Sequence, residues 1–128
     1  MTSSIRIKRA YDCGEPDDGY RVFVDRLWPR GLSKQTFKYD VWCKDLAPST
    51  ELRTWFGHKV ERWAEFRKKY QSELHTPDQI ERMTGLIDAA GKQTITLVYS
   101  AKDTEHNQAV VLAEEMTKIS HTGHKESH

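Results

Sequence analysis

The sequence predicts a single-domain α/β fold, a layered sandwich in which a small mixed sheet of about four strands is flanked by helices. Two patterns support this prediction. Short β-branched stretches alternate along the chain with longer stretches that have apolar residues every three or four positions. The length of 128 residues corresponds to one domain and is enough to bury a core. Segments of these two kinds typically pack as helices against a sheet.

Strands are predicted in four places. Alternating apolar and basic residues over 5–8 predict the first strand, and the apolar stretch 21–27 predicts the second. The loop between them is too short for a crossover helix, which favours an antiparallel arrangement of these two strands. A third strand is expected over 37–45. The β-branched segment 94–99 is expected to lie centrally in the sheet.

Helices are predicted in the middle of the chain. Ser49 or Thr50 is the expected cap of the first helix, and Gly57 ends it. A second helix is expected over about 59–74, with aromatic residues on one face. A capping box at 76–79 opens the third helix.

The last helix is expected to begin at a cap formed by Asp103 and Thr104 and to reach about Ile119. Residues 1–119 then form one domain. The polar segment 120–128 is expected to be a disordered tail.

Composition and charge exclude several classes of protein. A net charge of +1 counts against a dedicated nucleic-acid-binding domain, which is usually strongly basic. The two cysteines provide neither a disulfide scaffold nor zinc-ligand spacing, and no metal or cofactor is expected. The sequence has no signal-peptide pattern and no apolar run of transmembrane length. We therefore expect a cytoplasmic protein without membrane association, while its oligomeric state stays open.

Basic side chains follow the predicted strands and stand close to predicted helix starts. Such positions meet at one edge of an α/β sheet, where ligands collect near free helix N–H groups. The sequence therefore predicts a pocket for an anionic small molecule. Its basic candidates are Arg26, Arg30, Lys44, Arg53 and Lys102.

A structural role for these cations is the alternative, since an arginine at a strand end often pairs with a carboxylate, here Asp25 or Asp45. Phosphate loops, dinucleotide-binding motifs and nucleophile elbows are absent from the sequence. Asp25 and Asp103 are the candidates for a catalytic general base, and His106 comes third.

The stretch from Asp25 to Gly31, which reads Asp-Arg-Leu-Trp-Pro-Arg-Gly, is distinctive. Together with Leu-Ala-Pro-Ser at 46–49, Leu52-Arg53 and the segment 99–107, it resembles the YeaO-like branch of the DUF488 family. The resemblance extends from Ile5 to about Ile119.

The resemblance implies a bacterial or archaeal cytoplasmic protein but no activity, because the family is uncharacterised. It adds Ser49 and Asn107 to the candidate ligand-binding residues. Other branches look as though they carry cysteine at the position of Tyr99 and Cys-His-Arg at 107–109, residues that this chain lacks. The family's recurrent polar positions correspond to Lys8, Arg9, Asp25, Arg26, Arg30, Lys44, Ser49, Arg53, Lys102, Asp103 and Asn107.

Three hypotheses remain open from the sequence. The first is an enzyme or binding protein for a ligand that carries phosphate or carboxylate, with nucleotides among the possibilities. The second is a non-catalytic domain that binds a protein partner, and it predicts an exposed apolar patch without a polar pocket. The third is a nucleic-acid-binding module, whose affinity must depend on salt.

Overall fold

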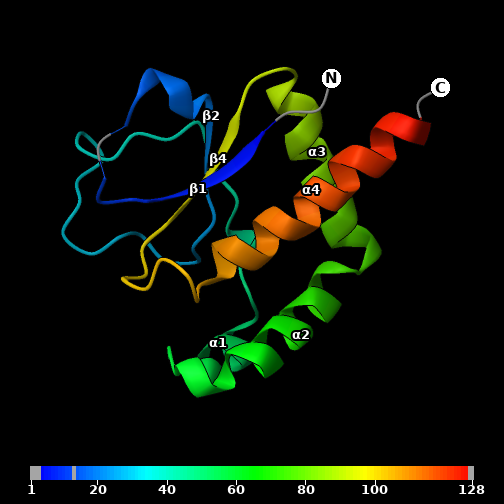
Figure 1. Cartoon of the computed structure of the whole chain (residues 1–128). Helices are drawn as coiled ribbons and strands as arrows, with labels where there is room; N and C mark the ends of the chain where they lie inside the picture. Colours follow the sequence, from blue (N-terminus) through cyan, green and yellow to red (C-terminus); the bar gives the residue numbers. More distant parts are fainter. Residues whose placement is uncertain (1–3, 13, 127–128) are drawn as a thin grey trace.

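In the part of the chain that the structure describes, four strands form one parallel sheet in the order β1-β4-β2-β3. Figure 1 labels three of them, β1, β2 and β4. The computed structural model describes residues 4–12 and 14–126. The α/β fold class and the number of strands are therefore confirmed. The strands are β1 (Ile5–Arg9), β2 (Tyr20–Phe23), β3 (Val41–Trp42) and β4 (Ile95–Tyr99).

The expected antiparallel pairing of the first two strands is wrong, and the sheet is parallel rather than mixed. β4 lies between β1 and β2, as predicted for a central strand, and Leu97 aligns with Ile7 on one side and Val22 on the other. Because β4 lies between β1 and β2, the connection from β1 to β2 only has to bring the chain back to the edge of the sheet where the strands begin. Just before β2, Gly19 lies close to the backbone of Thr94 and has a φ of 65°. A Cβ atom there would lie 2.3 Å from the carbonyl oxygen of Thr94.

The third strand is much shorter than the predicted range 37–45. Only Val41 and Trp42 pair with β2. The alternating aromatic residues before them pack instead: the ring of Phe37 lies 5.0 Å from that of Phe23 and 5.4 Å from that of Trp28. The pattern that resembled a strand is therefore the pattern of a small aromatic core.

Helices follow β3 and β4, and their bounds are α1 (Thr50–Phe56), α2 (Trp63–Leu74), α3 (Pro77–Ala90) and α4 (Gln108–Glu126). Ser49 is the N-cap of α1, as one of the two predictions stated, because its Oγ accepts a hydrogen bond from Leu52 N. Gly57 ends α1 in the left-handed conformation. A 3-10 turn at Val60–Arg62 replaces the expected first turn of α2.

Thr76 is the N-cap residue of α3 and Pro77 its first residue, as predicted, but the expected capping hydrogen bond is not formed, since the Thr76 hydroxyl donates to the carbonyl oxygen of Glu73. The predicted cap of the last helix is wrong. Asp103 closes a turn by accepting hydrogen bonds from the N–H groups of Glu105 and His106. The cap of α4 is Asn107, whose Oδ1 accepts from Val110 N. At its other end α4 continues past the expected last residue, Ile119, to Glu126.

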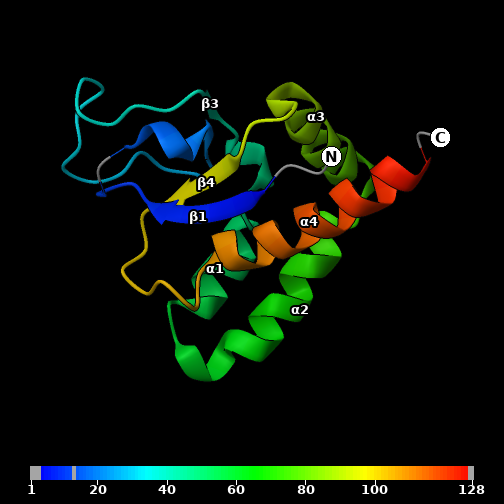
Figure 2. The ribbon, with the colours of Figure 1, turned by 45° about the horizontal axis from the view of Figure 1, so that its top comes forward.

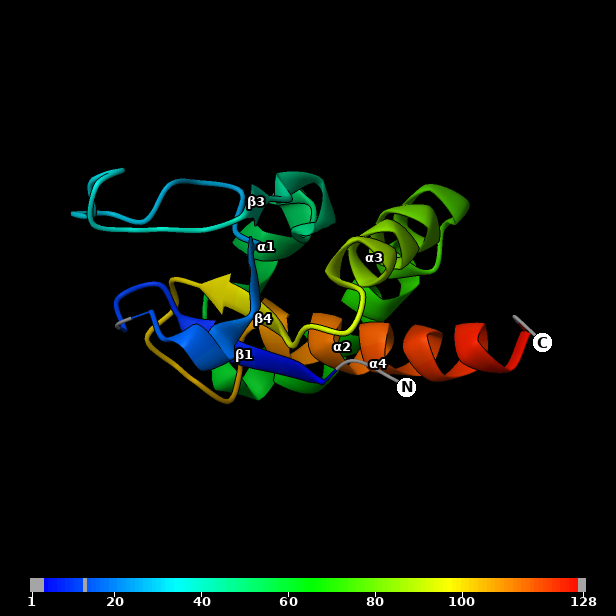
Figure 3. The same cartoon turned by 90° about the horizontal axis from the view of Figure 1, so that it is seen from above.

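The two faces of the sheet have different cores. One core joins the sheet to all four helices, and α4 contacts both β1 and β4. The other contains Phe23, Phe37 and Val98 with the surrounding aromatic side chains. Figures 2 and 3 show the loop between β2 and β3, residues 24–40, which contributes Phe37 to this core, on the side away from α2 and α4. Among the described residues, no helix is long and apolar enough to span a membrane.

Candidate ligand-binding site

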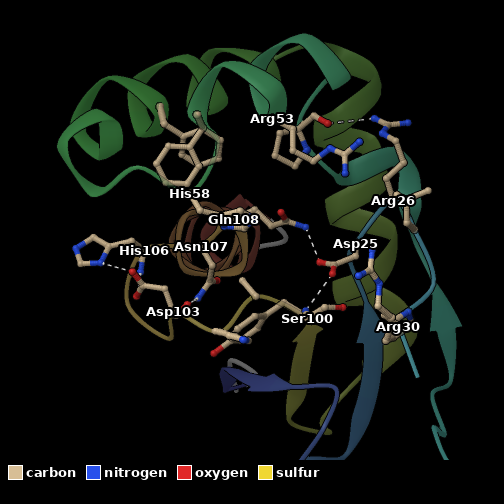
Figure 4. A pocket seen from close by; sticks show the side chains of 18 of the residues that line it. Asp25, Arg26, Arg30, Arg53, His58, Ser100, Asp103, His106, Asn107 and Gln108 are labelled. Atoms are coloured by element: carbon tan, nitrogen blue, oxygen red, sulfur yellow. Dashed lines mark hydrogen bonds and ion pairs between the residues drawn. The ribbon is translucent and has the colours of Figure 1, made fainter. Parts of the chain in front are cut away.

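A pocket of about 650 Å³ opens at the carboxyl ends of β2 and β4 (Figure 4). Its walls come from the segments that follow β1, β2 and β4, from α1 and α2, and from the first turn of α4. The parallel sheet explains this convergence, because strand ends that are distant in sequence meet at one edge. The lining residues are Tyr11, Asp25, Arg26, Leu27, Trp28, Pro29, Arg30, Pro48, Arg53, Phe56, His58, Phe66, Tyr99, Ser100, Ala101, Lys102, Asp103, His106, Asn107 and Gln108.

The structure brings most of the predicted site residues to this pocket. The residues that line it are Asp25, Arg26, Arg30, Arg53, Lys102, Asp103 and Asn107. Lys44 and Ser49 do not line it. Lys44 has its Nζ 4.4 Å from the centre of the Trp42 ring, and Ser49 hydrogen-bonds Glu73 while it caps α1.

Three cationic side chains of the pocket form no direct contact with a carboxylate among the described residues, although the charge of Arg53 acts on Asp25. No hydrogen bond or ion pair joins the side chain of Arg30, Arg53 or Lys102 to another residue in the described part of the chain. Arg26 donates from Nη2 to the carbonyl oxygen of Pro48 at 3.2 Å, and its Nε is buried without a partner among the described residues. The salt bridges with Asp25 or Asp45 that a structural role would require are therefore not formed there.

Asp25 is a fixed hydrogen-bond acceptor in the same pocket. Its Oδ2 accepts from Ser100 N at 3.0 Å, and its Oδ1 accepts from Gln108 Nε2 at 2.8 Å. Burial raises the pKa of this carboxyl group, and the hydrogen bond from Ser100 N and the positive charge of Arg53 oppose that rise. Asp25 thus has the better placed carboxylate for receiving a proton from a bound molecule.

Asp103 and His106 form a pair on the opposite side of the pocket from Asp25 (Figure 4). Asp103 Oδ2 lies 3.0 Å from His106 Nδ1. Hydrogen bonds from Glu105 N and His106 N, with the His106 side chain, lower the pKa of Asp103. A carboxylate of lowered pKa is a poor general base at neutral pH, so this pair is better suited to accept hydrogen bonds than to move protons.

Asn107 has a structural role in the wall of the pocket. Its Nδ2 donates to the carbonyl oxygen of Asp103 at 2.8 Å while its Oδ1 caps α4. The buried amide therefore ties the loop after β4 to the start of α4.

Several lining residues were missed in the sequence. Ser100 directly follows the predicted strand 94–99, so the strand-end argument could have found it. Gln108 could have been predicted to line the pocket only if the start of α4 had been placed correctly. His58 lies at the end of α1 with φ of 59°, a rare conformation for a residue other than glycine, and no sequence pattern indicates it.

Among the side chains that the structure describes, those of residues 4–12 and 14–120, no group of three or more histidine, cysteine or acidic residues is placed to hold a metal ion. The charged groups that line the pocket are arginine, lysine and aspartate side chains, and aromatic rings lie beside them.

Comparisons with known proteins agree with the resemblance found in the sequence. A family model described as the inactive DUF488-N3 subclade matches residues 4–127. The uncharacterized protein YeaO of Escherichia coli is 49% identical over 111 residues, which cover 87% of this chain and 95% of that protein. The uncharacterized protein Rv3073c of Mycobacterium tuberculosis is 41% identical over 110 residues, covering 86% of this chain and 91% of that protein. No solved structure matches the chain significantly. The chain belongs to the DUF488 family, within the subclade described as inactive DUF488-N3.

Proposed function

We propose that this protein binds a small molecule with a phosphate or carboxylate group, of which nucleotides are one class, in the pocket at the carboxyl ends of β2 and β4. One observation carries the proposal: Arg30, Arg53 and Lys102 line a single cavity, and their side chains form no hydrogen bond or salt bridge among the described residues. An arginine offers a planar fork that matches carboxylate and phosphate oxygens. An anionic ligand would provide the partner that the protein does not.

Binding without turnover fits this pocket better than catalysis. The family model that matches the chain is described as inactive. Asp25 already accepts two hydrogen bonds, and the pKa of Asp103 is lowered. In the proposed role both carboxylates orient a ligand.

The distribution of charge favours a small ligand over nucleic acid. The net charge of the chain is +1, and Arg30, Arg53 and Lys102 lie together in one concave pocket. A hollow lined by charged groups also differs from the exposed apolar patch that the partner-binding hypothesis predicts.

Thermal-shift screening tests the proposal. Phosphate, sulfate, nucleotides, phosphorylated sugars and short oligonucleotides would be tested on the wild type, on Arg30→Ala and on Arg82→Ala. Arg82 is an exposed arginine of α3 outside the pocket, so its variant is the matched control. A ligand at 100 times its Kd adds about 2.7 kcal/mol to the free energy of unfolding, which raises Tm visibly.

The expected result is a rise in Tm for at least one anion in the wild type and in Arg82→Ala, and its loss in Arg30→Ala. A rise that is equal in all three proteins would contradict a pocket site. Shifts caused only by oligonucleotides and abolished by salt would favour nucleic acid instead. A flat screen with all three proteins folded would reject the small-ligand proposal and favour a protein partner.

A further inference from the structure

We propose that Asp25 is the specificity-determining acceptor of the pocket, and that the ligand carries hydroxyl groups beside its anionic group, as phosphorylated sugars and nucleoside monophosphates do. The inference rests on the proposed function and narrows its ligand class. It starts from one juxtaposition: a carboxylate fixed by two hydrogen bonds lies within a pocket whose other charged groups are mainly arginine and lysine.

Asp25 is held rigidly in one orientation. Gln108 Nε2 donates both to Asp25 Oδ1 at 2.8 Å and to the carbonyl oxygen of Val24 at 3.0 Å, which anchors the amide to the end of β2. Ser100 N, at the end of β4, holds the other carboxylate oxygen. Trp42 Nε1 donates to the backbone oxygen of Asp25 at 2.7 Å. Two strand ends and the first turn of α4 thus fix the position of this carboxylate.

The carboxylate keeps capacity for further hydrogen bonds. An ionised carboxylate has about four acceptor positions, and protein donors in the described residues use one on each oxygen. None of the ion pairs within residues 4–12 and 14–126 joins Asp25 to the arginines of the pocket. In Figure 4, Arg26, Arg30 and Arg53 gather on the same side of the pocket as Asp25.

A negative group in an anion pocket has a predictable effect on selection. An anion without hydroxyl groups would form favourable contacts with the arginines, but the negative charge of Asp25 would repel it. A ligand that places a hydroxyl against Asp25 gains a charge-assisted hydrogen bond, and its anion can still reach Arg30 or Arg53. A site built to receive a donor discriminates against the analogue that lacks it, because the buried acceptor is then left unpaired.

The pocket also has room for the rest of such a ligand. Its volume of about 650 Å³ is much larger than a single phosphate requires and falls in the range of sites for small organic ligands. Phe56, His58 and Phe66 also line the pocket, with ring centroids of Phe56 and His58 6.2 Å apart. These rings offer an apolar wall for a sugar or a base.

Calorimetric titration with a matched pair of probes tests the inference. The probes are adenosine 5′-monophosphate and its 2′,3′-dideoxy analogue, which has the same phosphate and base but lacks both ribose hydroxyls. The wild type should bind the dideoxy analogue about 10- to 100-fold more weakly, the range expected for a hydrogen bond to a charged group. Arg30→Ala should weaken both probes equally, because each carries the same phosphate.

The variant Asp25→Asn should bring the ratio of the two Kd values close to one. Its fold is checked by Tm, and if it does not fold, Gln108→Leu serves as the second variant because it removes the donor that orients Asp25 Oδ1. That variant should lower the ratio by several-fold.

The outcomes separate the two proposals. Equal affinity of the wild type for both probes, or an unchanged ratio in a folded Asp25→Asn protein, would overturn the role of Asp25 and leave the anion site standing. Binding of inorganic phosphate but not of adenosine 5′-monophosphate would likewise overturn only the ligand class. If no anion of the screen binds, both proposals fail.

Discussion

Replacement of Asp18 by asparagine should destabilise the protein strongly without affecting the pocket. Asp18 is 3% exposed. Its carboxylate accepts from Lys8 Nζ at 3.2 Å, from Arg21 Nη1 and from Glu15 N at 3.1 Å. It lies just before β2, at the end of the sheet opposite the pocket.

The expected loss follows from leaving two cations without their shared partner. The side chains of Lys8 and Arg21 are only 16% and 12% exposed, so water compensates them poorly. Breaking a buried ion pair from one side typically costs 3–5 kcal/mol. Asparagine retains one acceptor, which places the expected loss at about 3 kcal/mol. In a chain of 128 residues this corresponds to a decrease in Tm of about 10 °C.

The pH dependence gives an independent check. Burial opposes ionisation of Asp18, but the hydrogen bonds from Glu15 N, Lys8 and Arg21 outweigh it and lower the pKa of the carboxyl group. A group whose pKa is lowered by folding stabilises the protein above its unfolded pKa, about 3.9, and loses that contribution as the pH falls through the folded pKa. The difference in stability between wild type and Asp18→Asn should therefore be full at pH 7 and shrink below about pH 4.

Urea denaturation followed by tryptophan fluorescence measures these differences. Glu15→Gln is the matched control, because Glu15 also contacts Lys8 Nζ, at 3.3 Å, but has a side chain that is 68% exposed. It should cost less than about 1 kcal/mol. A loss below about 1 kcal/mol for Asp18→Asn, or a difference that does not change on acidification, would refute the argument from burial and charge.

Three further predictions concern the backbone and the caps. Ser49→Ala should lower the free energy of unfolding by about 1–2 kcal/mol because Ser49 caps α1, whereas Thr76→Ala should change it by less than about 0.5 kcal/mol because that hydroxyl caps nothing; urea titrations of both variants check this contrast. Gly19→Ala should lower it by about 3 kcal/mol or more, since a Cβ would meet the carbonyl oxygen of Thr94, and normal stability of the variant by calorimetry would contradict this. His58→Gly should raise Tm by relieving a left-handed φ of 59°, an effect of about 1 kcal/mol that a lower Tm would disprove.

The sequence predicted elements whose signals are local. β4 was found because its β-branched residues are buried on both faces, and α1 because Ser49 and Gly57 mark its ends. The pairing of the strands depends on residues that are distant in the sequence, because β4 lies between β1 and β2. The short connection between the first two strands therefore led to the wrong prediction of an antiparallel pair. The third strand was overestimated because aromatic residues that alternate for packing look like residues that alternate for pairing.

The position of the pocket was predictable in part. The rule that ligands collect at the carboxyl ends of strands singled out Arg26, Arg30 and Lys102, which lie in the segments after β2 and β4 and line the pocket. The same rule failed for Lys44, which follows the two-residue edge strand β3 and whose Nζ lies over the ring of Trp42 instead of in the pocket. His58 could not be found, because the left-handed backbone that turns it at the end of α1 depends on tertiary packing.

The links between pocket residues explain why the site depends on the whole fold. Asp25 follows β2, Ser100 follows β4 and Gln108 begins α4, yet hydrogen bonds join the three into one unit. Asn107 links the same helix start to the loop after β4. Because this unit exists only when β4 lies between β1 and β2, a change that disturbs the insertion of β4 should abolish ligand binding together with stability. A change such as Asp18→Asn, which weakens the opposite end of the sheet, should lower stability alone. Measuring ligand binding and stability in both kinds of variant therefore shows whether the pocket depends on the position of β4 or only on the overall stability of the protein.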